Sequence, residues 1–408
     1  MDMLNVSGPG RARASRAARW SLAVLAACVL SACGGGDGAA SAQDGELSAV
    51  AALGEKIFSD AGLSASGAQS CASCHDPAHA HAQSNALSVQ LGGPNLDVPG
   101  FRAVPSLRYL SSNPVFAFDS EGTAIGGFNR DGRAQSLAEQ AQRPFLAPHE
   151  MANASKADLV ARLKLAAYAE EFRKVFGASI FDNADEAFDR AVFALQRYQI
   201  EDSGFHPFDS KYDLFLAGKV QLSTAELRGL ALFNSPAKGN CASCHTSARG
   251  ADGSPPLFTD FSFDNLGVPR ASTADIPATA DSNYFDLGLC GPDRSDLAER
   301  TDLCGAFKVP TLRNVATRRV FFHNGHFKSL REALRFYVRR DTNPEEWYPT
   351  VDGVVQKFDD LPPQYRANVN TSEAPYNRQP GMAPALSDDE IEDLIAFLGT
   401  LTDGYTGQ

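Results

Sequence analysis

The sequence predicts a mainly α-helical protein with two similar domains in tandem, and three observations support this prediction. One pentapeptide, Cys-Ala-Ser-Cys-His, occurs at residues 71–75 and again at residues 241–245. Each copy follows a stretch that contains a glycine and then an Ile-Phe or Leu-Phe pair, at residues 53–58 and 228–233. Elsewhere apolar residues recur with helical spacing and seldom alternate. Because a repeated supersecondary pattern indicates repeated structural units, we expect two domains of one kind.

The repeated pentapeptide is the attachment signal for a c-type haem. The two thiols add across the vinyl groups of the porphyrin, and the histidine that follows becomes the proximal ligand of the iron. The residues concerned are Cys71, Cys74 and His75 in the first copy and Cys241, Cys244 and His245 in the second. A zinc site would need a second close Cys or His pair, and a redox dithiol would not need the histidine twice. The sequence therefore predicts two cytochrome c-like domains, each with one covalent haem c.

A domain of this kind begins with a helix, carries its haem motif directly after that helix, and closes with a second helix packed across the first. The closing helices are expected at residues 187–200 and 387–401, where apolar side chains follow a helical period. Ser387 and Glu390 stand at capping-box spacing at the start of the later helix.

Two further helices are expected at residues 156–176 and 329–339. Segments rich in Gly, Pro and Asn are expected to form long loops over the haem edges. These segments are residues 91–114, 249–293 and 341–384.

The first 32 residues have the pattern of a signal peptide. Four arginines precede a short apolar run at residues 21–30, which is too short to span a bilayer. Residues 30–33 resemble a lipobox, in which cleavage precedes Cys33 and this cysteine is lipidated. An ordinary signal peptide, cut after a small residue, is the alternative. Residues 33–50 would then be a flexible tether between the membrane and the folded protein. The protein would lie in the periplasm of a bacterium, and an anchor in the outer membrane is favoured over one in the inner membrane.

The boundary between the two domains is expected between Ser203 and Leu222, which gives an N-terminal domain of residues 51–208 and a C-terminal domain of residues 209–408. The formal net charge of the chain is −12, and removal of residues 1–32, with four Arg and one Asp, leaves −15. An acidic surface disfavours binding to nucleic acid and to anionic lipid. Contact with a membrane is therefore expected only through the lipid anchor.

Two cysteines belong neither to the signal peptide nor to the haem motifs. Cys290 and Cys304 are fourteen residues apart. In an oxidising compartment we expect them to form a disulfide. Two buried free thiols are the alternative.

Four further stretches, together with the haem motifs, resemble the bacterial dihaem cytochrome c peroxidases and their relatives of the MauG type. The resemblance runs from about residue 53 to residue 405. It implies an oxidoreductase whose first haem reacts with hydrogen peroxide, beside a distal pair formed by Gln140 and Glu150. The four stretches are residues 131–141, with Asp-Gly-Arg-Ala and Glu-Gln-Ala, residues 148–151, residues 307–315 and residues 322–325.

The chemistry of peroxide cleavage explains such a pair. One oxygen of peroxide must lose a proton and the other must gain one, and a carboxylate above the iron serves as general base and then as general acid. Glu150 would move the proton, and the neutral amide of Gln140 would orient the peroxide. A surface or helix-capping acid is the alternative reading of Glu150.

The resemblance also bears on the other iron ligands. Leu91 stands where some relatives carry a distal histidine that binds the first iron. We expect His79 and His81 to be polar residues with satisfied hydrogen bonds and not iron ligands. The first iron would therefore have an open coordination position.

For the second iron, composition alone would suggest Met382 as the sixth ligand. The register of the family points instead to Tyr337, since MauG-type enzymes carry a tyrosine there. A buried aromatic on a helix face is the alternative for Tyr337.

Two departures from the family pattern affect the region between the haems. Relatives place a tryptophan relay where this chain has Arg130. They also hold a calcium ion through an asparagine, where this chain has Ala103, and through carbonyl groups at positions matching Arg318 and Val320. Calcium is therefore left open as a cofactor and is not predicted.

The resemblance implies a dihaem peroxidase that reduces hydrogen peroxide to water with electrons from a small periplasmic cytochrome c or copper protein. One alternative is MauG-type, peroxide-dependent oxidation of side chains on a partner protein. Tyr337 favours this alternative, because tyrosinate is a poor ligand for a readily reduced haem. A non-enzymatic electron-transfer cytochrome is the third hypothesis, and Gln140 and Glu150 argue against it.

Overall fold

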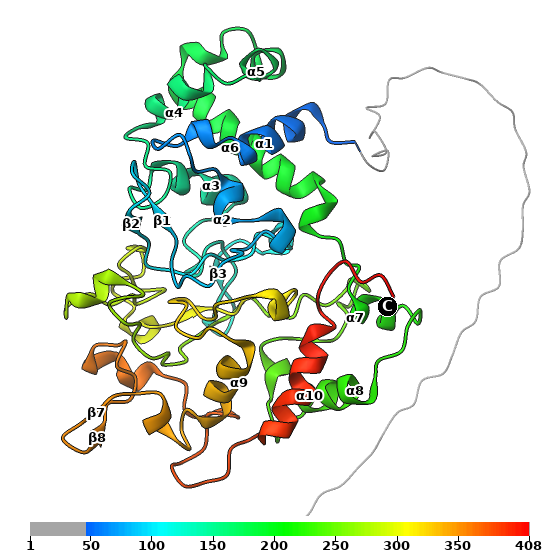
Figure 1. Ribbon diagram of the computed structural model, residues 1–408, viewed down its shortest axis with the longest axis vertical. Coiled ribbons are helices and arrows are strands. Elements are labelled where there is room, and N and C mark those ends of the chain that lie inside the picture. The colour runs from blue at the N-terminus through cyan, green and yellow to red at the C-terminus, as the bar shows by residue number, and fades with distance from the viewer. Residues whose placement is uncertain (1–45, 408) are drawn as a thin grey trace, which may run out of the picture. The chain divides into compact units, whose positions relative to one another are not determined.

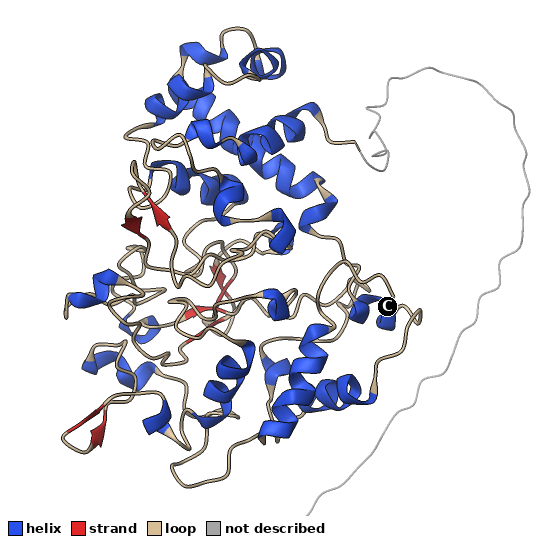
Figure 2. Ribbon diagram, viewed as in Figure 1, coloured by secondary structure: helices blue, strands red, loops and turns tan. Residues whose placement is uncertain are grey.

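The computed structural model describes residues 46–407, so Cys33 and the expected signal peptide lie outside the described residues. The chain divides into a unit at Met1–Glu46 and a compact unit at Leu47–Gln408, and the account below concerns the compact unit. The described part is mainly helical, and its strands are short and lie among long loops (Figure 2). None of the described helices is both long enough and apolar enough to span a membrane.

The described residues form ten α-helices, four two-stranded antiparallel ladders and eleven short 3-10 helices. The α-helices are α1 Ala49–Ser59, α2 Cys71–Cys74, α3 Leu137–Leu146, α4 Lys156–Leu163, α5 Ala169–Phe176, α6 Ala184–Glu201, α7 Lys211–Leu216, α8 Thr224–Asn234, α9 Leu330–Arg339 and α10 Asp388–Gly399. The ladders pair β1 Leu91–Gly92 with β2 Val98–Pro99, β3 Ala117–Phe118 with β4 Ala124–Ile125, β5 Phe263–Asp264 with β6 Phe307–Lys308, and β7 Thr350–Val351 with β8 Val354–Val355. The 3-10 helices are Ala61–Leu63, Pro77–His79, Leu110–Ser112, Ile180–Asp182, Ser203–Phe205, Cys241–Ser243, Pro277–Ala280, Thr301–Leu303, Val315–Thr317, Pro344–Glu346 and Pro363–Asn368.

The first hydrophobic core lies where α1 packs across α6 (Figure 1). Its members fall between Leu53 and Phe205 in the sequence. Gly54 makes the close crossing possible, because a Cβ at this position would lie 2.1 Å from the backbone oxygen of Ala194. The side chain of Ser48 caps α1 by accepting a hydrogen bond from the backbone N–H of Ala51.

The second hydrophobic core repeats this arrangement with α8 and α10. Gly229 occupies the crossing, and a Cβ there would lie 2.0 Å from the backbone oxygen of Asp393. At the start of α10, Ser387 and Glu390 form the capping box that the sequence predicted. Both closing helices are therefore confirmed. The glycine in each opening helix allows the two helices to cross at close distance.

The prediction of a single helix at residues 156–176 was wrong, because the chain forms α4 and α5 with a turn between them. The hydroxyl of Tyr168 in this turn donates a 2.7 Å hydrogen bond to the carboxylate of Asp60, far away in the sequence. Tyr168 is also buried in the first core. A tertiary contact thus overrides the local helical period. The helix predicted at residues 329–339 is confirmed as α9.

The predicted loops contain only short regular elements. The first includes the strand pair β1–β2, and the third includes β7–β8. Their positions between the helices allow these segments to reach the walls of the cavities described next.

Candidate functional site

Each haem motif lines a cavity of its own. The first cavity has a volume of about 180 Å³ and the second of about 300 Å³. Cys71, Cys74 and His75 line the first cavity, and Cys241, Cys244 and His245 line the second. Five residues, which we call the shared wall, line both: Pro105, Leu107, Asn129, Arg130 and Gln140.

The two motif histidines are held by backbone carbonyls in the manner of iron ligands. The Nδ1 atom of His75 lies 3.1 Å from the carbonyl oxygen of Pro105 and 3.3 Å from that of His81. The Nδ1 atom of His245 lies 2.8 Å from the carbonyl oxygen of Phe258. Because an Nδ1–H that donates to a carbonyl leaves the Nε2 lone pair free, each ring has the tautomer that binds a metal.

Burial keeps these histidines neutral. It lowers the pKa of His75 to about 4, and it also lowers the pKa of His245. The thiols of Cys71, Cys74, Cys241 and Cys244 are free of disulfides. Each motif therefore presents two thiols and one imidazole lone pair to a cavity, which is the donor set that a covalent haem requires.

Glu150 and Gln140 both line the first cavity. Gln140 lies in the first turn of α3, which Ser136 caps by accepting a hydrogen bond from the backbone N–H of Glu139. Glu150 lies in the turn after α3, and its backbone N–H donates to the carbonyl of Ala147. The helix and its following turn thus bring the two side chains to one cavity.

The carboxylate of Glu150 has a free acceptor. Its Oε2 atom is buried and has no hydrogen-bond partner among the described residues. A buried carboxylate oxygen without a partner is costly, so it indicates a place for a donor from outside the protein. Burial raises the pKa of Glu150, and the positive charges of Arg143 and Arg133 oppose that rise.

Two arginines and an aspartate surround this carboxylate. Asp293 accepts a 2.6 Å hydrogen bond from Arg143 and lies 3.4 Å from Arg133. The Nε2 atom of His149 lies 3.8 Å from Oε1 of Glu150. All four residues line the first cavity. Nothing in the sequence alone indicated that these residues surround Glu150, although His149 precedes it in the chain and Arg133 belongs to the family-like stretch at residues 131–141.

Tyr337 lies in α9 and lines the second cavity with His245. Its ring lies 5.5 Å from that of Phe322 and 6.1 Å from that of Tyr376. Burial raises the pKa of the Tyr337 phenol, so in the protein alone the side chain is neutral. A bound metal ion reverses this preference, because it stabilises the anion of its ligand.

The two methionines of the described chain lie elsewhere. Met382 is 48% exposed, its sulfur accepts a hydrogen bond from the backbone N–H of Gln379, and it is not among the residues that line the second cavity. Met151 is buried and lines the first cavity. Tyr337 is thus the ligand candidate that the structure brings to the second cavity, and Met382 is not.

The histidines after the first haem motif differ from each other. The Nδ1 atom of His79 lies 2.9 Å from the carboxylate of Asp76, so its hydrogen bonding is satisfied as expected. The Nδ1 atom of His81 is buried and has no hydrogen-bond partner in the part of the chain that the structure describes, which differs from that expectation. The His81 ring stacks on Phe205 at 3.9 Å and lines neither cavity. The backbone carbonyl of His81, and not its ring, contacts His75 of the first haem motif.

The region expected to hold calcium in relatives carries positive charge here. The Nε atom of Arg130 donates a 3.0 Å hydrogen bond to the carbonyl of Ala103, and Arg318 donates a 2.8 Å hydrogen bond to the carbonyl of Val104. Ala103 offers no side-chain oxygen to a calcium ion, and the two guanidinium charges beside it disfavour a second cation. The residues present therefore do not fit a calcium ion at this place.

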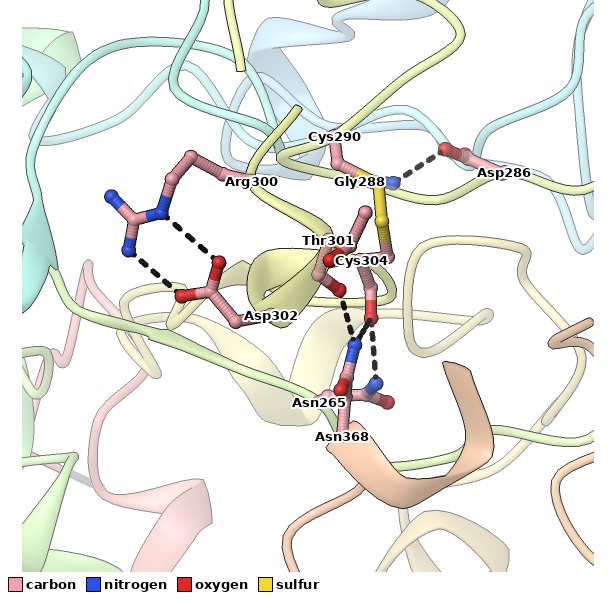
Figure 3. Close-up of a disulfide and its surroundings, with 9 residues drawn as sticks. All are labelled: Asn265, Asp286, Gly288, Cys290, Arg300, Thr301, Asp302, Cys304 and Asn368. Atoms are coloured by element: carbon pink, nitrogen blue, oxygen red, sulfur yellow. Dashed lines mark hydrogen bonds and ion pairs between the residues drawn. A yellow bond between two sulfur atoms is a disulfide. The ribbon is translucent and has the colours of Figure 1, made fainter. Parts of the chain in front are cut away.

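Cys290 and Cys304 form a disulfide (Figure 3). The carbonyl of Cys304 accepts hydrogen bonds from the side-chain amides of Asn265 and Asn368, at 3.1 and 3.2 Å. The loop between the two cysteines carries Asp293, which binds the arginines beside Glu150. The disulfide thus closes a loop that contributes a carboxylate to the first cavity.

This architecture, with two Cys-x-x-Cys-His motifs lining adjoining cavities, is that of a dihaem c-type protein. A family model described as di-haem cytochrome c peroxidase matches residues 48–221. The methylamine utilization protein MauG of Paracoccus denitrificans is 36% identical over 368 residues, which cover 87% of this chain and 89% of that protein. The cytochrome c551 peroxidase of Nitrosomonas europaea is 29% identical, with 73% of this chain and 76% of that protein covered.

The crystal structure of the diheme peroxidase BthA from Burkholderia thailandensis matches with a TM-score of 0.79 and 39% sequence identity, and covers 87% of this chain and 86% of that one. A tyrosine-to-methionine variant of the same enzyme matches with a TM-score of 0.78. The chain belongs to the family of dihaem cytochrome c peroxidases and MauG proteins. It is an oxidoreductase with two haem c cofactors, and the resemblance seen in the sequence is confirmed.

Proposed function

We propose that this chain is a dihaem peroxidase that reduces hydrogen peroxide to water with electrons from a small periplasmic cytochrome c or copper protein. The observation that carries the proposal is the unpartnered Oε2 atom of Glu150, buried in the cavity that His75 lines. One haem would be held by Cys71, Cys74 and His75 in a domain of residues 51–208. The other would be held by Cys241, Cys244, His245 and Tyr337 in a domain of residues 209–408.

The two hydrophobic cores support this division into tandem cytochrome c-like domains. One core has its members between Leu53 and Phe205, and the other between Tyr212 and Leu401. The expected boundary between Ser203 and Leu222 contains the break between them.

A haem bound in the first cavity would supply the redox chemistry of the iron. Glu150 would take a proton from one oxygen of peroxide and hold it on Oε2. It would then return this proton to the other oxygen, which leaves as water. Two electrons and two further protons complete the reduction of one peroxide to two waters. The amide of Gln140 donates to peroxide without competing for the proton.

The charges around Glu150 suit both halves of this task. Burial raises its pKa, which makes the carboxylate a stronger base, and the positive charges of Arg143 and Arg133 offset part of this rise. Glu150 must be ionised to act as the base. The rate of peroxide consumption should therefore fall as the pH decreases through the pKa of Glu150, and this fall should occur at a higher pH than the usual pKa of a glutamate would give.

The test replaces Glu150 by glutamine, which keeps the shape and removes the base. We expect peroxide consumption to slow by about 10²–10⁴-fold while haem content stays unchanged. Glu121→Gln is the matched control, because Glu121 is exposed and lines neither cavity. A Glu150→Gln protein that consumes peroxide at the wild-type rate would assign the proton transfer to another group.

A second candidate function is the peroxide-dependent oxidation of side chains on a partner protein, as in MauG-type enzymes. Two observations favour it, namely the position of Tyr337 in the second cavity and the 36% identity to a MauG protein. A phenolate oxygen stabilises ferric iron, so a haem with this ligand is a poor entry point for electrons from a mild donor.

Redox assays separate the two candidates. A peroxidase fed by a small cytochrome should turn over peroxide with that reduced donor at steady state. The MauG-type enzyme should react with peroxide in its fully ferric form and should accept few electrons from ascorbate. If the chain is a MauG-type enzyme, Tyr337→Met should make the second haem reducible by mild donors. Met382→Leu should leave the absorbance spectrum of the second haem unchanged.

The periplasmic, lipid-anchored location remains part of the proposal. It rests on the sequence of residues 30–33 and on the pair of cysteines that forms a disulfide.

A further inference from the structure

Three cationic side chains lie where the two cavities meet, and none of them forms an ion pair with another residue in the described range 46–407. Arg130 belongs to the shared wall, and Arg318 and Lys308 line the second cavity. Their recorded side-chain hydrogen bonds all go to backbone carbonyls, those of Ala103, Val104 and Gly127 respectively. Among the described residues, the two terminal nitrogens of Arg130 have no hydrogen-bond partner, although a guanidinium has five donors.

The nearest carboxylates are already engaged. Asp286 accepts two hydrogen bonds from Arg102, at 2.6 and 2.7 Å. Asp131 accepts from Arg102 and from Arg133, both at 2.6 Å. Among the described residues, neither aspartate forms an ion pair with Arg130, although the charge of Asp286 acts on it, and the junction keeps an excess of positive charge.

Enclosed positive charge without a counter-ion is costly. Burial lowers the pKa of Arg130 to about 9, of Arg318 to about 10 and of Lys308 to about 7. Each group is thus destabilised as a cation in the protein alone. A bound anion would remove this cost, and a carboxylate is the anion whose geometry a guanidinium matches with two parallel hydrogen bonds.

We propose that Arg130, Arg318 and Lys308 form a carboxylate-binding site that takes the propionate groups of the haems, with Arg130 shared by both haems. The inference rests on the proposed placement of one haem in each cavity. It assigns a role to the residue that replaces the tryptophan of relatives, since Arg130 would connect the two haems through hydrogen bonds. It also gives a reason why the junction has no place for calcium, because fixed guanidinium charges stand there instead.

The test measures the midpoint potentials of both haems by optical redox titration of the fully loaded protein, without peroxide. Ferric haem carries one more positive charge than ferrous haem, so loss of a nearby cation should stabilise the ferric form and lower the potential. Arg130→Gln should lower both potentials, because Arg130 lines both cavities. Arg318→Gln should lower the potential of the second haem, whose cavity Arg318 lines, and Arg130→Lys should restore most of the loss seen in Arg130→Gln.

The control is Arg300→Gln, since Arg300 pairs with Asp302 at the surface and lines neither cavity. Potentials in Arg130→Gln and Arg318→Gln that equal those of the control would overturn the proposal. Potentials of the wild-type protein that shift with added chloride would also overturn it, because they would assign the site to a free anion. The outcome is independent of Glu150, since no proton transfer from peroxide is measured.

Discussion

Gly229 provides a direct test of how the second haem motif is positioned. It lies in α8, the helix that leads into the motif at residues 241–245, at the crossing with α10. Replacement by alanine adds a Cβ that would lie 2.0 Å from the backbone oxygen of Asp393 and 2.7 Å from Cβ of Phe397. Neither obstacle is a flexible side-chain end, so the two helices must separate.

The magnitude follows from these distances. Real Cβ atoms do not approach other atoms closer than 3.0 Å, so the helices must move apart by about 1 Å. Overpacking of this kind costs about 3 kcal/mol, and the better helix propensity of alanine offsets about 1 kcal/mol. The net loss of about 2 kcal/mol corresponds to a fall in Tm of about 4–8 °C for a domain of roughly 200 residues.

Thermal unfolding followed by circular dichroism measures this loss, and the absorbance spectrum of the second haem reports displacement of its motif. Gly399→Ala is the matched control, because Gly399 also lies in a helix of this core but a Cβ there meets nothing within 4 Å. We expect Gly399→Ala to be neutral or slightly stabilising. A Gly229→Ala protein as stable as this control would refute the close crossing.

Three further outcomes are expected. Replacing Cys290 and Cys304 by serine opens a loop of about 15 residues and should cost about 3 kcal/mol relative to the wild-type protein, measured by thermal unfolding. Reductant should destabilise the wild-type protein similarly, and a wild-type stability that reductant leaves unchanged would contradict the disulfide. Asp213→Asn removes the charge of the carboxylate to which the buried Arg313 donates hydrogen bonds of 2.9 and 2.8 Å, and should cost about 3 kcal/mol because Asp403 still lies 3.9 Å from Arg313. Burial alone would raise the pKa of Asp213, but hydrogen bonds and charge from Arg313 outweigh it and lower that pKa, so this stability is present above the unfolded pKa and lost as pH falls through the lower folded value. Cys33→Ser should release the protein from the membrane fraction, and a wild-type protein that is already soluble would disprove the lipid anchor.

Some features were predictable because they depend on local chemistry. The haem motifs are covalent signals that need their residues in fixed order, and the closing helices follow from helical periodicity and a capping box. Glu150 and Gln140 were found through the resemblance, whereas their charged neighbours Arg143 and Asp293 were not. These two residues are 150 positions apart and meet only in the folded chain.

The sequence by itself thus determined the helical class, the two haem attachment motifs and the family. Only the tertiary structure decided that the helix expected at residues 156–176 is broken, since the hydrogen bond from Tyr168 to Asp60 is not encoded in any local period. Only the tertiary structure placed Arg130 in the walls of both cavities, with its one side-chain hydrogen bond among the described residues made by Nε. The physical reason is the same in both cases, because the free energy of a buried polar or charged group depends on partners that distant parts of the chain supply or withhold.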